Sequence, residues 1–217
     1  MTGCGRGGTE SRREYGMFEL LANSFSQSGQ ESFVLNMLNM KTDGFYVEIG
    51  AYHSTDLSNT YVLESQFSWK GVAFEIDPKK SKEYNRGRSN LCVTADATNF
   101  NYSECFEKLN TPAVIDYLQV DIEPAFQSLA ALKLLPWDEY TFKVITFEHD
   151  LYVNPENEVI QQEAFDLLSG HGYSQVAKNV KSNGLPYEDW YCYPDFVSED
   201  MKSVSLASDS EWRTFFL

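Results

Sequence analysis

Acidic residues recur at one kind of position along this chain of 217 residues. Each short apolar run that is typical of a strand ends in a carboxylate or is followed by one. These carboxylates are Glu48, Glu75, Asp96, Asp121 with Glu123, and Glu148 with Asp150. The carboxyl ends of parallel strands share one edge of an open sheet, and ligands bind beyond that edge. The spacing therefore predicts one acidic site, suited to a ligand with hydroxyl donors and a positive charge. For any single acid, low β-propensity or helix capping is an alternative explanation.

The elements that must position these acids alternate along the chain. Strand-like runs occupy residues 45–49, 71–76, 91–95, 115–120 and 142–147. Helical spacing of apolar residues occupies 30–39, 56–66, 102–109, 126–135 and 156–169, and the polar segment 79–85 permits a helix. Two further runs, 173–180 and 189–193, flank the turn signal at residues 182–184 and predict an antiparallel pair. This alternation predicts an α/β fold, a Rossmann-like doubly wound sheet with helices on both faces.

The composition limits the possible partners. The chain carries 32 Asp and Glu against 17 Lys and Arg, a net charge of −15, and 15% of its residues are aromatic. Aromatic residues at this level predict a buried core, whereas the negative charge repels phosphate backbones and argues against a nucleic-acid partner. No apolar run approaches the roughly 20 residues of a membrane span. We expect a small-molecule or glycan partner, and the sequence holds no signal for the oligomeric state.

The beginning of the chain differs from the rest. Residues 1–16 are rich in Gly, Arg, Glu and Ser and lack the apolar segment of a secretion signal. We interpret them as a disordered extension and residues 17–217 as a single domain. The four cysteines form no CxxC pair and no zinc spacing with the histidines, which favours reduced thiols and a cytoplasmic location.

The loop after the first strand narrows the choice of ligand. Residues 50–55 read GAYHST, which cannot supply the GxGxxG of a pyrophosphate-binding loop, and no GxxxxGK[ST] motif occurs. Glu75 follows Gly50 by 25 residues and ends the second strand, where an acid commonly accepts hydrogen bonds from ribose hydroxyls. S-adenosylmethionine fits these acids, because it carries a ribose, an adenine amine, an ammonium and a sulfonium.

Six motifs in order, FYVEIGAY, SNTYVLE, WKGVAFEIDP, TADAT, IDYLQVDIEP and ITFEHD, carry a family resemblance. The chain resembles the FkbM family of class I S-adenosylmethionine-dependent methyltransferases over residues 26–194. The resemblance implies a seven-stranded sheet, mainly parallel with the last strand antiparallel. It also implies methyl transfer, usually to an oxygen and often to a sugar hydroxyl.

The resemblance assigns roles to individual residues. Glu48, Gly50 and Ala51 match the first cofactor motif, and Glu75 matches the ribose-binding acid. Asp96 matches the acid near the adenine amine. The implied cofactor set is completed by Tyr52, Ser58, Asn59, Ile76, Ala97 and Asp121, the last near the methionine moiety or the reaction centre. The chain departs from the family at residues 52–54, where Tyr-His-Ser replaces a later glycine, and in Asp-Ile-Glu-Pro, where Asp-Val-Glu-Gly is usual.

A base is needed if the acceptor is an aliphatic hydroxyl, because its proton must leave as it attacks. His149 is one candidate, since Glu148 and Asp150 flank it and could orient its ring; Asp121 and Glu123 are rivals. Alternatively, Asp121, Glu123, Glu148 and Asp150 could hold Mg²⁺, which prefers oxygen ligands. An N- or protein methyltransferase and a non-enzymatic Rossmann-like binding module remain alternative functions.

Overall fold

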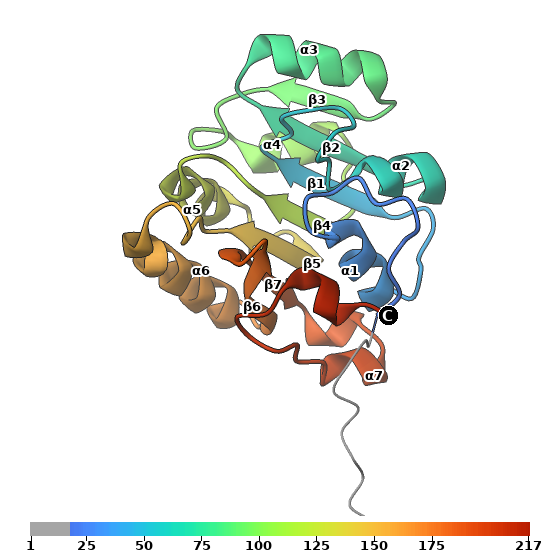
Figure 1. The fold of residues 1–217 in the computed structure, drawn as a ribbon. Helices are drawn as coiled ribbons and strands as arrows, with labels where there is room; N and C mark the ends of the chain where they lie inside the picture. The colour runs from blue at the N-terminus through green and yellow to red at the C-terminus, as the bar shows by residue number, and fades with distance from the viewer. Residues whose placement is uncertain (1–17) are drawn as a thin grey trace, which may run out of the picture.

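A computed structural model describes residues 18–217, so the extension predicted at residues 1–16 lies outside the described part. One sheet contains all seven named strands in the order β3-β2-β1-β4-β5-β7-β6 (Figure 1). The strands are β1 Phe45–Ile49, β2 Lys70–Glu75, β3 Leu91–Thr94, β4 Val114–Val120, β5 Thr141–Glu148, β6 Ser174–Ser182 and β7 Leu185–Cys192. Strands β1 to β5 pair in parallel, and β7 is antiparallel to both β5 and β6. The predicted doubly wound α/β fold with an antiparallel last strand is confirmed.

The helices follow the strands in alternation. They are α1 Gln30–Met37, α2 Tyr61–Phe67, α3 Pro78–Gly87, α4 Tyr102–Lys108, α5 Ala125–Leu134, α6 Glu158–Gly170 and α7 Glu199–Lys202, with short 3₁₀ turns at Pro155–Asn157, Pro194–Phe196 and Trp212–Phe215. Each helix between residues 18 and 217 falls short of the length and apolar character that a membrane span needs.

Two element boundaries differ from the sequence prediction by four or five residues, and the others by no more than two. Helix α2 begins at Tyr61 rather than near residue 56, and the Ser58 hydroxyl accepts the backbone N–H of Tyr61 at 3.1 Å. Residues 50–60 are therefore a long loop at the edge of the sheet. Strand β7 begins at Leu185 rather than 189, directly after Asn183 and Gly184, whose φ angles of 54° and 82° are those of a tight hairpin turn.

Alternating side chains of the strands fill two cores on opposite faces of the sheet. Tyr46 and Tyr117 point toward the face that α1 and the C-terminal residues cover, whereas Val47 and Leu118 point toward α4, α5 and α6. The two ends of the described chain meet on the first face (Figure 1), where the Leu217 N–H donates to the Phe18 carbonyl at 2.8 Å. The loop 50–60 lies at the edge of this first face.

Gly50 lets the ends of two central strands meet. Its φ is 90°, and a Cβ at this position would lie 1.7 Å from the carbonyl oxygen of Asp121. The Asp121 N–H donates to the Ile49 carbonyl at 2.9 Å, so β4 continues beside β1 up to this point. Only glycine permits this approach, which brings the loops after β1 and β4 to one place.

Candidate active site

A cavity of about 520 Å³ opens at the carboxyl edge of the sheet. The loops after β1, β2, β3 and β4 line it, together with the end of β5. Of the residues predicted to bind a cofactor, ten line this cavity: Glu48, Gly50, Ala51, Tyr52, Asn59, Glu75, Ile76, Asp96, Ala97 and Asp121. Glu123 and Glu148 also line it. Ser58 does not, because its buried hydroxyl faces the N-terminus of α2 and Arg88. The tertiary structure thus brings the strand-end carboxylates together.

Glu75 is held rigidly at the end of β2. Its two carboxylate oxygens accept the backbone N–H groups of Tyr52 at 3.0 Å and Asp77 at 2.8 Å. Each oxygen keeps lone-pair capacity for a further donor. Asp96 is exposed on the next loop, where Thr98 donates to it through backbone and hydroxyl, which lowers the pKa of Asp96. Asp96 is therefore an ionised acceptor at neutral pH.

Two buried amide side chains on the cavity wall lack partners. The Asn59 Oδ1 and the Gln119 Oε1 are shielded and accept no hydrogen bond from the protein, although their residues are only 7% and 2% exposed. A buried polar atom without a partner costs about 1–3 kcal/mol. Such a cost is offset when a ligand supplies the missing donors.

Glu48 lies deepest on the cavity wall. It is 2% exposed, and its Oε2 accepts the Thr60 hydroxyl at 2.9 Å and the Tyr84 hydroxyl at 3.0 Å. Burial raises the pKa of Glu48 to about 7, although Arg88 and these two hydrogen bonds act in the opposite direction. Glu48 is thus close to half ionised at neutral pH.

Three acids gather on the other side of the cavity. Asp121 and Glu148 lie within hydrogen-bond contact of each other, and Glu188 is the cross-strand partner of Glu148 in the β5–β7 pairing. Burial raises the pKa of both Asp121 and Glu148, and their mutual proximity makes them share a proton. Burial raises the pKa of Glu188 to about 8. Glu188 therefore holds a proton at neutral pH, and none of the three acids forms an ion pair with a Lys or Arg of residues 18–217.

His149 lies away from the cavity. Its ring is completely buried, with Nε2 3.3 Å from the Asp189 carboxylate and 3.2 Å from the Gln161 amide nitrogen. Its Nδ1 accepts the backbone N–H of Leu151 at 3.3 Å. The structure therefore places this candidate base in a polar network between β5, β7 and α6, whereas Asp121 and Glu123 face the cavity.

Solved structures share this arrangement of sheet and helices. A candidate rRNA methylase from Clostridium thermocellum matches with a TM-score of 0.55 and 12% identity over 82% of this chain and 99% of its own. An O-methyltransferase from Bacillus cereus in complex with SAH matches with a TM-score of 0.51 and 14% identity over 80% and 84%. A candidate O-methyltransferase from Klebsiella pneumoniae matches with a TM-score of 0.50 and 12% identity over 80% and 83%.

The chain has the class I methyltransferase fold. No family model matches its sequence. No curated protein matches it either. At 12–14% identity the likeness concerns the fold, and the FkbM resemblance stays a prediction.

The four acids proposed for Mg²⁺ do not form a common site. Within residues 18–217, no three carboxylate, imidazole or thiol side chains converge as metal ligands would. Glu123 is exposed, and Asp150 does not line the cavity that Asp121 and Glu148 share. The geometry of these side chains gives the Mg²⁺ alternative no support.

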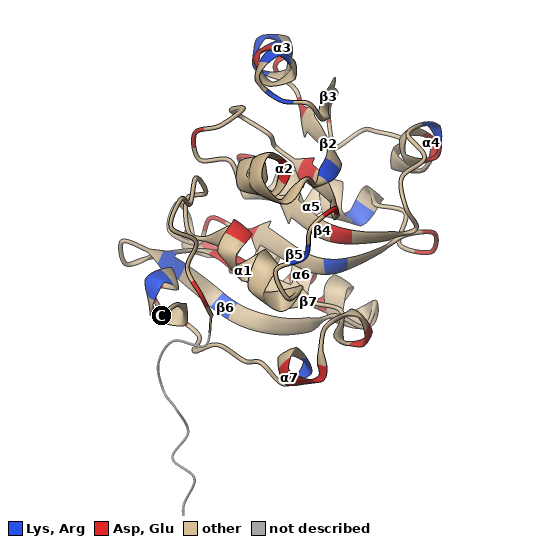
Figure 2. Cartoon of the chain, turned by 90° about the vertical axis from the view of Figure 1, so that its right-hand side faces the viewer, with Lys and Arg blue, Asp and Glu red and all other residues tan. Residues whose placement is uncertain are grey.

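Several cavity residues escaped the sequence analysis. Gln119 could have been predicted from the sequence. It lies two residues before Asp121 at the end of β4, and so its side chain points to the same face of the sheet as that of Asp121. Several residues of α3 are basic (Figure 2), and one of them, Lys80, lines the cavity with its Nζ 4.0 Å from the Tyr52 ring centre. Arg88 and Glu188, which lie behind the cavity wall and do not line it, carried no local signal, because their partners lie on other elements.

Proposed function

We propose that this chain is a methyltransferase that uses S-adenosylmethionine. The observation that carries the proposal is the unpartnered Gln119 Oε1 and Asn59 Oδ1 on the wall of an acidic cavity. This wall offers mainly acceptors and negative charge, which suit a ligand rich in donors and bearing positive charge. Such a ligand on a class I methyltransferase fold is S-adenosylmethionine, which supplies an electrophilic methyl group when bound.

The wall divides into binding roles. Glu75 would accept the ribose hydroxyls, since its oxygens are already aimed by two backbone N–H groups. Asp96 would accept the adenine amine. Glu48 and Gln119, which are neighbours in the β1–β4 register, would receive the amino-acid part together with Asn59. These assignments follow the cavity outward from β1 to β3.

The acid pair Asp121 and Glu148 is the best candidate for proton removal. An acceptor hydroxyl needs a base within hydrogen-bond reach, and a base with a pKa near the working pH is the most effective. Burial raises the pKa of Asp121, and the pair can exchange one proton internally. We assign the base to this pair rather than to His149, whose ring contacts Asp189 and Gln161.

The acceptor is a neutral or cationic small molecule in this proposal, such as a sugar hydroxyl. Asp121, Glu123 and Glu148 face the acceptor side and would repel an anionic acceptor, including a nucleic-acid backbone. The candidate rRNA methylase of Clostridium thermocellum shows that RNA is an alternative on this fold. An amine acceptor is a second candidate, because the uncompensated charge of the acid pair favours a cation.

Calorimetric titration with S-adenosylmethionine tests the proposal. We expect a dissociation constant in the micromolar range and a loss of at least about 100-fold in Glu75→Gln, which removes one charged acceptor of the ribose. Glu83→Gln is the matched control, because Glu83 is exposed on α3 and away from the cavity. No binding by the unaltered chain would refute the proposal and favour a binding module of the same fold.

A further inference from the structure

We propose that Arg88, which does not line the cavity, is the positioning residue that holds the loop 50–60 and Glu48 in the geometry that binds the cofactor. This inference rests on the proposed function for its ligand. Its structural part, the ordering of the loop by one guanidinium, stands on the contacts of the unliganded protein.

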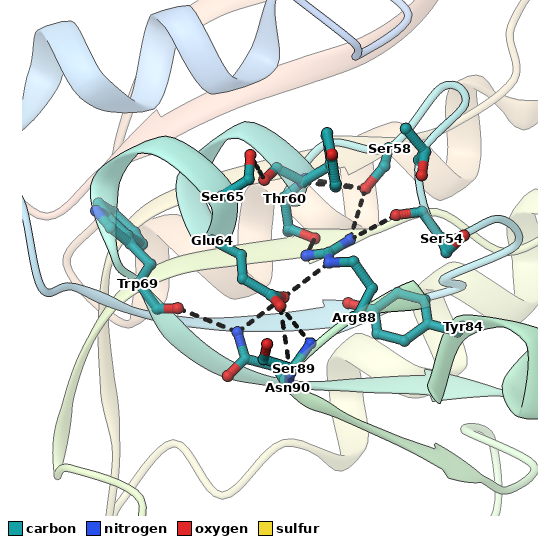
Figure 3. Close-up of polar contacts among 12 residues, drawn as sticks. Ser54, Ser58, Thr60, Glu64, Ser65, Trp69, Tyr84, Arg88, Ser89 and Asn90 are labelled. Atoms are coloured by element: carbon teal, nitrogen blue, oxygen red, sulfur yellow. Dashed lines mark hydrogen bonds and ion pairs between the residues drawn. The ribbon is translucent and has the colours of Figure 1, made fainter. Parts of the chain in front are cut away.

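Arg88 joins the loop to the sheet and to α2 (Figure 3). Its side chain is 1% exposed, and every one of its five N–H donors has a partner in the protein. Nε donates to Glu64 at 2.7 Å, Nη1 to the Ser54 carbonyl at 3.0 Å and Ser58 Oγ at 3.2 Å, and Nη2 to the Tyr46 hydroxyl at 3.0 Å and Thr60 Oγ1 at 3.1 Å. Three of these five partners belong to the loop itself.

Thr60 transmits this constraint to the cavity wall. Its Oγ1 accepts from Arg88 and donates to the Oε2 of Glu48 at 2.9 Å. Tyr84 completes a second path, since its hydroxyl donates to the same Oε2 and contacts the Tyr46 hydroxyl at 3.1 Å. One guanidinium therefore sets the position of a carboxylate that it does not touch.

The loop needs contacts outside itself, because residues other than glycine adopt left-handed backbone conformations in it. Only Gly50 among residues 50–60 is a glycine, whereas Tyr52 and Leu57 adopt left-handed backbone conformations with φ of 46° and 59°. The loop makes few internal hydrogen bonds, which join Thr55 to Ser58 and His53 to the two N–H groups of Thr55 and Asp56. Hydrogen bonds to β2 hold residues 50–52 of the loop, whereas the Arg88 contacts hold its later part at Ser54, Ser58 and Thr60.

Lysine cannot replace this arrangement. The five partners of Arg88 lie around a planar fork, and an ammonium offers three donors from a single point. The positive charge of Arg88 also compensates the buried acids, because it lowers the pKa of Glu64 against the opposing effect of burial. Arg88→Lys therefore keeps the charge and changes the hydrogen-bond geometry, whereas Arg88→Gln removes the charge.

The ionisation of Glu48 provides a readout that a purely structural role would not move. The titratable or charged groups around it are Tyr46 on β1, Glu64 on α2, Tyr84 and Arg88 at α3, Cys92 on β3 and Tyr117 on β4. Arg88 is the cation that acts on Glu48. Cofactor affinity should improve as pH rises through about 7, where Glu48 becomes ionised. Arg88→Gln removes that cation and should move this midpoint upward.

Hydrogen–deuterium exchange of the unliganded protein tests the positioning directly. We expect the amides of residues 52–60 to exchange at least about tenfold faster in Arg88→Lys, with β5 unchanged, because charge-assisted hydrogen bonds to the loop are lost. Arg86→Lys is the control, since Arg86 is exposed two residues earlier on α3. Equal exchange in Arg88→Lys and in the unaltered protein would overturn the inference.

Calorimetric titration with S-adenosylmethionine then tests the functional part. Arg88→Lys should bind at least about tenfold more weakly, and Arg86→Lys should bind as the unaltered protein does. Should Arg88→Lys fail to fold, Thr60→Val replaces it, since it breaks the link to Glu48 and leaves the Arg88–Glu64 ion pair in place. An unchanged affinity, together with an unchanged midpoint of its pH dependence, would refute the inference if the variant is folded.

If the unaltered chain does not bind the cofactor, the proposed function fails. The exchange result still decides whether Arg88 orders the loop.

Discussion

Two groups of buried acids lie on the same face of the sheet and differ in one respect. At β1 and α2, Glu48 and Glu64 share the charge of Arg88, which pairs with Glu64 at 2.7 Å. At β4, β5 and β7, the acids Asp121, Glu148 and Glu188 form no ion pair with any Lys or Arg of residues 18–217. We call these the paired and the unpaired acid groups.

The difference separates structure from reactivity. The paired group has nearly all its polar atoms satisfied within the protein, so it forms a fixed wall for a ligand. Burial raises the pKa of each acid in the unpaired group, and nearby carboxylates raise these pKa values further, so the group carries less negative charge than three ionised acids would. A group of this kind can accept a proton or receive a cation at neutral pH. The unpaired acid group is therefore the better candidate for chemistry.

The largest effect should come from removing the cation of the paired acid group. Arg88→Met should lower the free energy of unfolding by about 4 kcal/mol, because Glu64 and Glu48 then remain buried without a counter-charge. Urea denaturation monitored by circular dichroism measures this change. A loss below about 1 kcal/mol would mean that the two acid groups do not differ in the way described.

Titration of the unpaired acid group should have the next largest effect. Glu188 has a folded-state pKa of about 8 against an ordinary value of 4.5, so the folded chain keeps a proton that the unfolded chain releases. The free energy of unfolding should therefore fall as pH rises from 4.5 to 8.

Denaturation curves across this pH range provide the measurement. Glu188→Gln should flatten the decline, and Glu83→Gln, on the exposed face of α3, should leave it unchanged. A stability that rises over the same range would show that Glu188 is ionised in the folded protein.

The smallest effect should be a gain in stability. Glu148→Gln removes one of two acids that share a proton. We expect the free energy of unfolding to rise by about 1 kcal/mol at pH 8, because the repulsion that it relieves is equivalent to roughly one pKa unit. Affinity for S-adenosylmethionine should change little, because a pair that shares one proton carries one negative charge and Asp121 keeps that charge in the variant. Thermal unfolding and calorimetry measure both, and a destabilised variant would contradict the assignment.

The central strands β1, β2, β4 and β5 were predicted within one residue because each is a largely apolar run that is buried over most of its length. β1 matches the prediction at both ends, whereas α2 begins five residues late because the capping of Tyr61 by Ser58 depends on where the loop lies. The strand-end acids could be predicted as one site, since the topology alone collects them. His149 shared this position in the sequence, but the chain turns its ring away from the cavity and toward Asp189.

The sequence by itself determined the order of the elements, the parallel sheet and the edge at which carboxylates gather. Local periodicity and the handedness of the connections suffice for these. Tertiary structure alone decided which acids carry charge. Arg88 reaches Glu64 from 24 positions away, and Glu148 meets Glu188 only because β7 inserts beside β5. Ionisation in a buried site depends on neighbours in space, and two acids of the same type can therefore have opposite roles.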